Sequence, residues 1–196
     1  MKRIILIFLV LFFSLNSVVS ADEIYVPSNA AILIERSTGQ ILYEKNSEER
    51  LPMASVTKTM TMLLAIEAVD SGKITMDDIV TVSENGSSMT GSRVYLSTNE
   101  KISVSDLLKS IAVSSGNDAA VTMAEYVAGN EESFVALMNK RAEELGLENT
   151  HFVNCCGLDA EGHYSSAHDL AAISDELLKH DSIRPFLVIW MDSIRD

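Results

Sequence analysis

The chain has 196 residues, 47% of them hydrophobic, which fits one globular domain with a substantial core, or at most two small domains. Its 28 acidic residues outnumber the 15 basic ones, and the formal net charge is −13. Because such a chain repels phosphate backbones and anionic lipid headgroups, nucleic acid is excluded as an expected partner.

The N-terminus has the pattern of a secretory signal peptide. Two basic residues precede an apolar run over 4–19, and the small residues at 19–21 form a cleavage site. A bilayer span needs ~20 apolar residues, so an uncleaved membrane anchor is the less favoured alternative. We therefore divide the chain into a signal peptide at 1–21 and a mature region at 22–196. The mature region is expected to be secreted or associated with the cell envelope.

A hairpin and a helix are the first elements predicted in the mature region. Two short strands are expected over 30–45, around the turn sequence Ser-Thr-Gly-Gln at 37–40. A helix is expected over 54–71, ending before Gly72. Its apolar residues are spaced as in an amphipathic stripe: Val56, Met60, Leu63 and Leu64. The segment 74–101 is rich in Ser, Thr, Gly and Asn, which predicts short strands and loops.

The second half of the chain is predicted to form a block of helices. Capping residues or helix stops delimit segments that begin after Ser103, cover 117–128 and 130–145, and run from Ser166 to about 180. The last eight residues, IWMDSIRD, also read as helical. A hairpin followed by a block of helices indicates an α+β fold with a helical subdomain.

Ser55 and Lys58 stand together in the first turn of the first predicted helix. Residues at i and i+3 are neighbours on a helix, so the hydroxyl and the amine can meet. A serine needs an adjacent base to become a nucleophile, and a lysine with a lowered pKa can serve. The helix N-terminus can stabilise an oxyanion. The pattern S-x-x-K is frequent by chance, so a helix cap with a solvated lysine is the alternative.

A companion motif lies at Ser115-Gly116-Asn117, between two predicted helices. S-x-x-K and S-x-N occur together in penicillin-binding proteins and class A β-lactamases. The serine can relay a proton, and the asparagine amide can orient the lysine or hold a substrate carbonyl. The alternative is a loop with an asparagine N-cap. A second S-x-N, at 97–99, is interpreted as a polar turn.

The two cysteines, Cys155 and Cys156, are adjacent and cannot join distant segments. A strained vicinal disulfide and a metal site are the alternatives, but no CxxC or HxxxH spacing accompanies the pair. We expect two turn residues and no metal.

These motifs resemble one family, the low-molecular-weight penicillin-binding proteins that are serine-type D-Ala-D-Ala carboxypeptidases. The resemblance rests on four stretches in order, at 54–60, 114–120, 145–152 and 157–167, and extends over nearly all of 24–196. It implies the penicillin-binding protein/β-lactamase-like transpeptidase fold, an antiparallel sheet with a helical subdomain.

The resemblance also implies a mechanism without metal or organic cofactor. Ser55 would attack the carbonyl between the two terminal D-alanines of a peptidoglycan stem peptide, forming an acyl-enzyme. Lys58 would accept the proton and Ser115 would pass it to the departing amine. Asn117 would bind substrate and steady Lys58. Water would hydrolyse the ester, and β-lactams would inhibit by mimicking the substrate.

The sequence departs from the family at its third motif. The family's K-T-G or H-T-G is absent, since the only Lys-Thr pair is Lys58-Thr59, followed by Met60. We therefore interpret 22–196 as the N-terminal part of the catalytic domain, without the C-terminal strands. Membrane association is expected only through segments that the sequence lacks or through an uncleaved signal.

Three other hypotheses compete with the carboxypeptidase interpretation. A Ser-His-Asp triad would need His163 and Asp169 beside Ser55, which nothing in the sequence indicates. A class A β-lactamase needs E-x-x-L-N, whose nearest match at 144–148 has Glu in place of Asn. The third is a truncated, non-catalytic protein that binds the cell wall.

Overall fold

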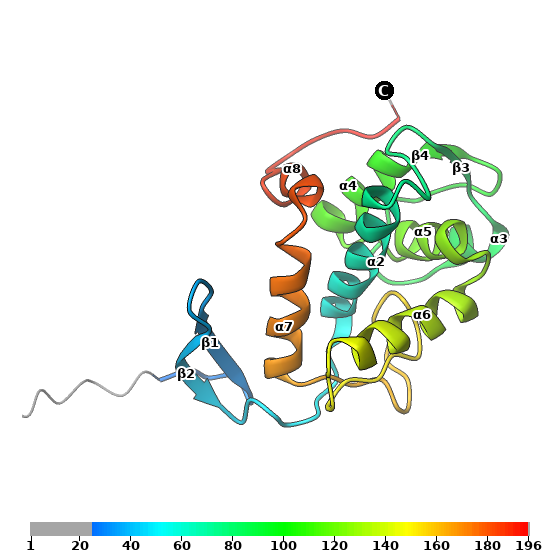
Figure 1. Ribbon diagram of the computed structural model, residues 1–196. Coiled ribbons are helices and arrows are strands. Elements are labelled where there is room, and N and C mark those ends of the chain that lie inside the picture. Colours follow the sequence, from blue (N-terminus) through cyan, green and yellow to red (C-terminus); the bar gives the residue numbers. More distant parts are fainter. Residues whose placement is uncertain (1–24, 196) are drawn as a thin grey trace, which may run out of the picture.

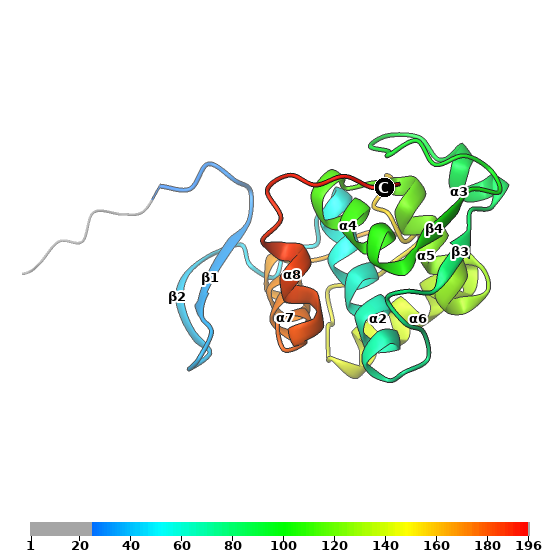
Figure 2. The same ribbon diagram turned by 90° about the horizontal axis from the view of Figure 1, so that it is seen from above.

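A computed structural model describes residues 25–195 (Figures 1 and 2). The predicted signal peptide at 1–21 lies outside the described residues. Over 25–195, none of the helices combines the length and the apolar character that crossing a membrane requires.

The predicted hairpin is confirmed. Strands β1 (Ala31–Glu35) and β2 (Gln40–Lys45) pair antiparallel, with a register shift between Leu33 and Ile34. The Glu35 carboxylate accepts hydrogen bonds from the backbone N–H groups of Ser37 and Thr38 and from both hydroxyls. These bonds, led by the Thr38 hydroxyl, lower the pKa of Glu35 to about 2. An ionised carboxylate therefore organises the turn.

The helical block is confirmed as well, with one helix at its centre. Helix α2 (Lys58–Asp70) is surrounded by four others, and the hairpin lies to one side of them, beside α7 (Ala167–Leu177) (Figure 1). Ser55 belongs to a 3-10 turn, η1 (Ala54–Thr57), that leads directly into α2. The helices are α2 (Lys58–Asp70), α4 (Val104–Ser114), α5 (Asn117–Ala128), α6 (Glu131–Glu144) and α7 (Ala167–Leu177).

Side-chain caps begin three of these helices as the sequence predicts. Ser103 Oγ accepts the Asp106 N–H at 3.0 Å, and Asn130 Oδ1 accepts the Ser133 N–H at 2.7 Å. The cap of α7 is the hydroxyl of Ser166. Such caps satisfy backbone donors that a helix leaves unpaired, which is why the starts can be read from sequence. Helix α7 ends at Leu177, three residues before the expected end.

The segment 74–101 holds the predicted strands and one helix that was not predicted. Strands β3 (Ile79–Thr81) and β4 (Lys101–Ser103) pair antiparallel, and α3 (Glu84–Ser88) lies between them in sequence. Helix α3 is capped by Ser83 and packs on α5. A short helix that contains a glycine has little intrinsic preference, so packing decides its formation. The turn at 97–99 is confirmed, with Ser97 N–H donating to Glu100.

The stripe predicted for α2 is wrong. Met60 and Leu63 are fully buried, but Val56 is 48% exposed and lies in η1 rather than α2. Residues on the other sides of α2, such as Thr61 and Ala65, are also fully buried. A helix packed against neighbours on all sides has no solvent-facing stripe.

The helix predicted at the C-terminal end is also wrong. After η2 (Asp181–Ile183), the short helix α8 (Arg184–Leu187) ends, and the described residues beyond it are irregular. This segment runs over α4, where the Lys109 amine donates to the Ser193 carbonyl at 2.9 Å. The Arg195 guanidinium donates to Glu100 at 2.6 Å. These polar contacts hold an extended path that a helix could not follow.

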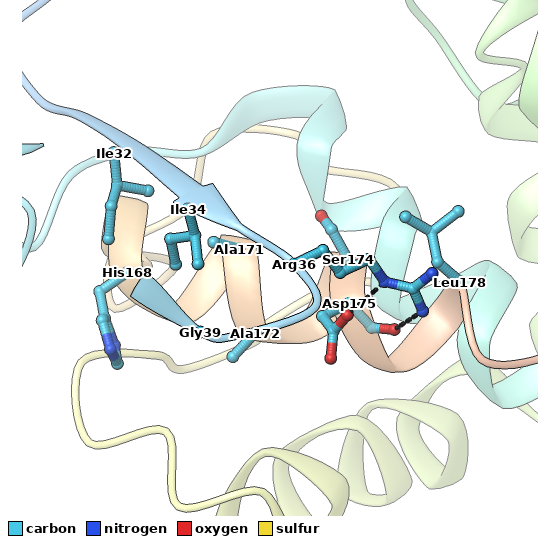
Figure 3. A pocket seen from close by; sticks show the side chains of 10 residues that line it. All are labelled: Ile32, Ile34, Arg36, Gly39, His168, Ala171, Ala172, Ser174, Asp175 and Leu178. Atoms are coloured by element: carbon cyan, nitrogen blue, oxygen red, sulfur yellow. Dashed lines mark hydrogen bonds and ion pairs between the residues drawn. The ribbon is translucent and has the colours of Figure 1, made fainter. Parts of the chain in front are cut away.

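A hollow of about 410 Å³ separates the hairpin from α7 (Figure 3). Apolar side chains from both elements line it, including Ile32 and Ile34 of β1. At one end Arg36 Nε donates to Asp175 Oδ1 at 2.6 Å, and this hydrogen bond is the main cause that lowers the pKa of Asp175. Ser55 and Lys58 do not line the hollow.

The burial of α2 predicts that Leu63→Ala and Val56→Ala change the free energy of unfolding by different amounts. An amphipathic stripe that buried both residues would predict similar changes. Leu63→Ala should lower the free energy of unfolding by about 2–5 kcal/mol, because it leaves a cavity in a packed core. Val56→Ala should change it by less than about 0.5 kcal/mol, because the side chain is half exposed. Chemical denaturation measures both. Equal losses would contradict the burial assigned to α2.

Candidate active site

Ser55 and Lys58 meet as the sequence predicts. Lys58 Nζ lies 3.2 Å from Ser55 Oγ, and Lys58 is only 2% exposed whereas Ser55 faces solvent. The amine also donates to the backbone carbonyl of Cys156 at 2.6 Å. A surface cap with a solvated lysine would leave this amine in water, so the structure disagrees with that alternative.

The environment of Lys58 favours its neutral form. Burial lowers the pKa of the amine, and the charges of the Cys156 and Cys155 thiols oppose this shift to a lesser degree. A lysine that can lose its proton can accept one from a neighbouring serine hydroxyl. The electrostatics therefore suit Lys58 as a base and Ser55 as a nucleophile.

The turn that carries Ser55 is held from below by a chain of hydrogen bonds. Ala54 adopts a left-handed φ of 45°, and its carbonyl accepts the Thr57 hydroxyl at 2.8 Å. Thr57 Oγ1 in turn lies 2.8 Å from His163 Nε2, and His163 Nδ1 accepts the Val153 N–H at 3.0 Å. Since Nδ1 accepts, the proton of a neutral ring is on Nε2, which donates to Thr57. Burial lowers the pKa of His163, in agreement with a neutral ring.

This chain of bonds argues against the catalytic triad. Both ring nitrogens of His163 are engaged, by Thr57 and Val153. The Asp169 carboxylate accepts from Asn149 N–H and from the Thr150 hydroxyl. Over residues 25–195, no hydrogen bond joins His163 to Asp169 or to Ser55. His163 supports the turn instead.

The turn at 154–158 forms a wall of the site that the sequence did not reveal. Cys155 and Cys156 are buried free thiols in a bend, and their carbonyls face α2, where Thr61 and Lys58 donate to them. Gly157 has φ +87°, and a Cβ on it would lie 1.9 Å from the Ala54 carbonyl oxygen. The glycine after two cysteines was the available signal, but the contact joins positions about a hundred residues apart.

The S-x-N motif lies at the junction of α4 and α5, both of which pack on α2. Ser115 has a left-handed φ of 54° and is partly buried. Asn117 is buried, and its Nδ2 donates to the Thr90 carbonyl at 2.6 Å. Within residues 25–195, no hydrogen bond joins Ser115 or Asn117 to Ser55 or Lys58.

Asp118 is a further residue that sequence reasoning missed. Its carboxylate is fully buried and accepts the N–H groups of Val94 and Leu96, at 3.2 and 3.0 Å to Oδ2. The residue therefore ties the loop over 90–96 to the start of α5, next to Asn117. An acid in the first turn of a helix is common, so this role could not be recognised from the residue pattern.

The segment 144–148, which was the nearest match to the β-lactamase motif, forms the end of α6 and the loop after it. Glu144 is the last residue of α6 and pairs with Lys140 and Arg141, each at 3.6 Å. The Glu148 carbonyl accepts from the Arg50 guanidinium. In the structure these contacts are those of a helix end and its following loop.

The fold and this serine–lysine arrangement define a protein of the penicillin-binding class. Penicillin-binding protein 6B from Escherichia coli superposes with a TM-score of 0.80 at 38% identity, covering 87% of this chain and 55% of that one. The carboxypeptidase DacD from Francisella tularensis gives 0.79 at 33% identity, covering 88% and 44%. The α+β fold inferred from the resemblance is thereby confirmed.

The chain belongs to the D-alanyl-D-alanine carboxypeptidase family, peptidase family S11, whose model matches residues 17–192. It is 53% identical over 175 residues to the D-alanyl-D-alanine carboxypeptidase DacF of Bacillus subtilis (strain 168), covering 89% of this chain and 45% of that protein. Identity to DacD of Escherichia coli (strain K12) is 40% over 192 residues, covering 91% and 50%. The chain thus spans about half the length of these relatives.

Gly157 and Gly146, which both have a positive φ, test the close approach of the 154–158 turn. Gly157→Ala should destabilise the fold by clearly more than Gly146→Ala. Both place a side chain at positive φ, which costs roughly 1–2 kcal/mol, but only position 157 meets a backbone oxygen. The difference in free energy of unfolding between the variants measures the clash. Equal values would show that the turn can move away from Ala54.

The buried amine predicts a pH dependence of stability. With a pKa below its ordinary value of 10.5, the folded state holds fewer protons than the unfolded state between the two values. The contribution of Lys58 should therefore become more favourable as pH rises through that window. Lys58→Met, which cannot titrate, should lack this increment. Denaturation of both proteins at alkaline pH measures the difference, and parallel profiles would contradict the lowered pKa.

Proposed function

We propose that the protein acts as a serine-type D-Ala-D-Ala carboxypeptidase, with residues 22–196 forming the N-terminal part of its catalytic domain. The observation that carries the proposal is the buried Lys58 amine 3.2 Å from Ser55 Oγ at the start of α2. The names of the relatives and the family model support the same activity. The proposed substrate is the peptidoglycan stem peptide that ends in D-Ala-D-Ala.

Acylation would proceed at the exposed hydroxyl of Ser55. Its oxygen attacks the carbonyl carbon of the penultimate D-alanine while Lys58 takes the hydroxyl proton. Backbone N–H groups at the start of the helix would stabilise the oxyanion. When the tetrahedral intermediate collapses, the C–N bond breaks and the terminal D-alanine leaves as a neutral amine. Ser115 would give its hydroxyl proton to this amine and take up the proton that Lys58 received from Ser55, which leaves Lys58 neutral for the next step.

Hydrolysis would then return the enzyme to its starting state. Water attacks the ester carbonyl, Lys58 accepts its proton, and Ser55 regains its hydroxyl as the shortened peptide leaves. Asn117 would bind the substrate. Since its Nδ2 now donates to Thr90, substrate binding would exchange that bond or use the amide oxygen. A β-lactam would enter the same acyl-enzyme and remain there, because its leaving group stays attached.

The site of action would be outside the cytoplasm. Peptidoglycan stem peptides are exposed on that side of the membrane, and the N-terminal sequence has the pattern of a secretory signal. This part of the proposal rests on the sequence and on the proposed substrate.

A fluorescent penicillin tests the nucleophile directly. A protein that carries residues 22–196 together with the rest of the catalytic domain should acquire a covalent label that maps to Ser55, and release D-alanine from a D-Ala-D-Ala peptide. Ser55→Ala should lose the label and lower D-alanine release by at least about 10³-fold, since the acyl-enzyme cannot form. Fluorescence on a denaturing gel measures the covalent label, and a D-alanine assay measures the release.

Ser97→Ala is the matched control, because it alters the other S-x-N sequence, which is a turn. It should label at the rate of the unaltered chain. A label that persists in Ser55→Ala would contradict the assigned nucleophile. If the protein with its whole catalytic domain folds and takes no label, the catalytic proposal is contradicted and a non-catalytic protein that binds the cell wall is favoured.

A further inference from the structure

A single side chain, that of Asn154, organises the turn that contacts Lys58. Its Oδ1 accepts the N–H of Gly157 at 2.7 Å and those of Cys156 and Leu158 at 3.2 Å. Its Nδ2 donates to the Leu158 carbonyl at 2.7 Å. Asn side chains commonly close turns by bonding the backbone that follows them, but here one amide engages four backbone groups.

The backbone of this turn has no other internal support. In the described structure, no backbone hydrogen bond joins residues 154–158 to one another or to another backbone segment. Apart from those to Asn154, the hydrogen bonds of this backbone within the described residues are with side chains of other elements: Glu131 at the Cys155 N–H, Thr61 at the Cys155 carbonyl and Lys58 at the Cys156 carbonyl. The shape of the turn therefore depends on the Asn154 amide.

The turn presents its carbonyl to Lys58 at the shortest polar contact that the amine makes. Lys58 Nζ lies 2.6 Å from the Cys156 carbonyl oxygen and 3.2 Å from Ser55 Oγ. A lysine side chain has four rotatable bonds, so the amine needs a second fixed partner to stay beside the serine. Gly157, packed against the Ala54 carbonyl, places that partner next to the nucleophile's turn.

We propose that Asn154 is a positioning residue for the acyl-transfer reaction, because it shapes the 154–158 turn so that the Cys156 carbonyl holds the Lys58 amine against Ser55. The inference rests on the proposed function and adds to it a residue outside the S-x-x-K and S-x-N motifs.

The same turn controls the electrostatics of the base. It covers Lys58, and burial is the main cause that lowers the pKa of the amine. The titratable groups that influence it are the thiols of Cys156 and Cys155, with Glu131 behind Cys155. The hydrogen bond between the two thiols lowers the pKa of Cys156 and raises that of Cys155. Without Asn154 the turn would open, water would reach Nζ, and the pKa of Lys58 would rise.

The test is an NMR titration of Lys58, labelled with ¹³C-lysine, in the protein that carries residues 22–196 together with the rest of the catalytic domain. The Cε resonance of Lys58 is assigned by its absence in Lys58→Met. In Asn154→Ala the midpoint should move upward, toward that of an exposed lysine, and the rate of penicillin labelling should fall by about 10²-fold. Asn154→Ser, which retains a shorter acceptor, should show a smaller shift and fall, and it replaces the alanine variant if that one does not fold.

Asn139→Ala is the matched control. Asn139 also bonds backbone of this segment, with Nδ2 to the Phe152 carbonyl and Oδ1 to the Phe152 N–H, both at 2.8 Å, but it does not touch 154–158. It should lower thermal stability and leave the Lys58 midpoint unchanged. The inference is overturned if the midpoint is unchanged in the folded Asn154 variants, or if Asn139→Ala moves it equally.

The two proposals fail in different ways. If the unaltered chain takes no penicillin label, the proposed reaction is overturned, and with it the catalytic meaning of Asn154, whatever the titration shows. If the unaltered chain is labelled but Asn154→Ala keeps the same midpoint and the same labelling rate, only the positioning role is overturned.

Discussion

The burial of one amine constrains most of this structure. Lys58 is 2% exposed in the first turn of α2, and an unpartnered buried ammonium would be strongly unfavourable. Its pKa is lowered, and it bonds the Ser55 hydroxyl and the Cys156 carbonyl. Four helices pack on α2 and contribute to removing this residue from water. A turn from the far part of the chain supplies an acceptor where α2 begins.

That requirement links sequence regions that have no local relation. The η1 turn carries Ser55 and rests on His163 through Thr57, while Gly157 packs against Ala54. Both supporting residues come from the segment between α6 and α7, about a hundred positions away. The nucleophile is therefore exposed on a turn whose backbone is held by buried contacts. A serine in a freely moving surface turn could not keep its distance from a base, and proximity of this kind is a large part of catalysis.

Local signals predicted the parts of the molecule that local forces decide. The turn of the hairpin, the caps at Ser103 and Asn130 and the pairing of Ser55 with Lys58 each depend on residues within four positions of one another. The missed features depend on packing between distant segments. The burial of α2 on all sides, helix α3 and the path after Leu187 follow from neighbours in space. The roles of Asp118 and of the Cys156 carbonyl are backbone contacts, which side-chain patterns do not encode.

The number of hydrogen-bond donors and acceptors on the Lys58 amine shows how the 154–158 turn and the S-x-N motif can act together. A neutral lysine amine has one lone pair and two N–H groups. In the proposed reaction the lone pair faces the Ser55 hydroxyl, and one N–H is engaged by the Cys156 carbonyl. One N–H remains, and helices α4 and α5, which carry Ser115 and Asn117, both pack on α2. The 154–158 turn thus holds the base before substrate arrives and leaves one donor for the proton relay. A second fixed acceptor on the amine would instead favour its protonated form and weaken it as a base.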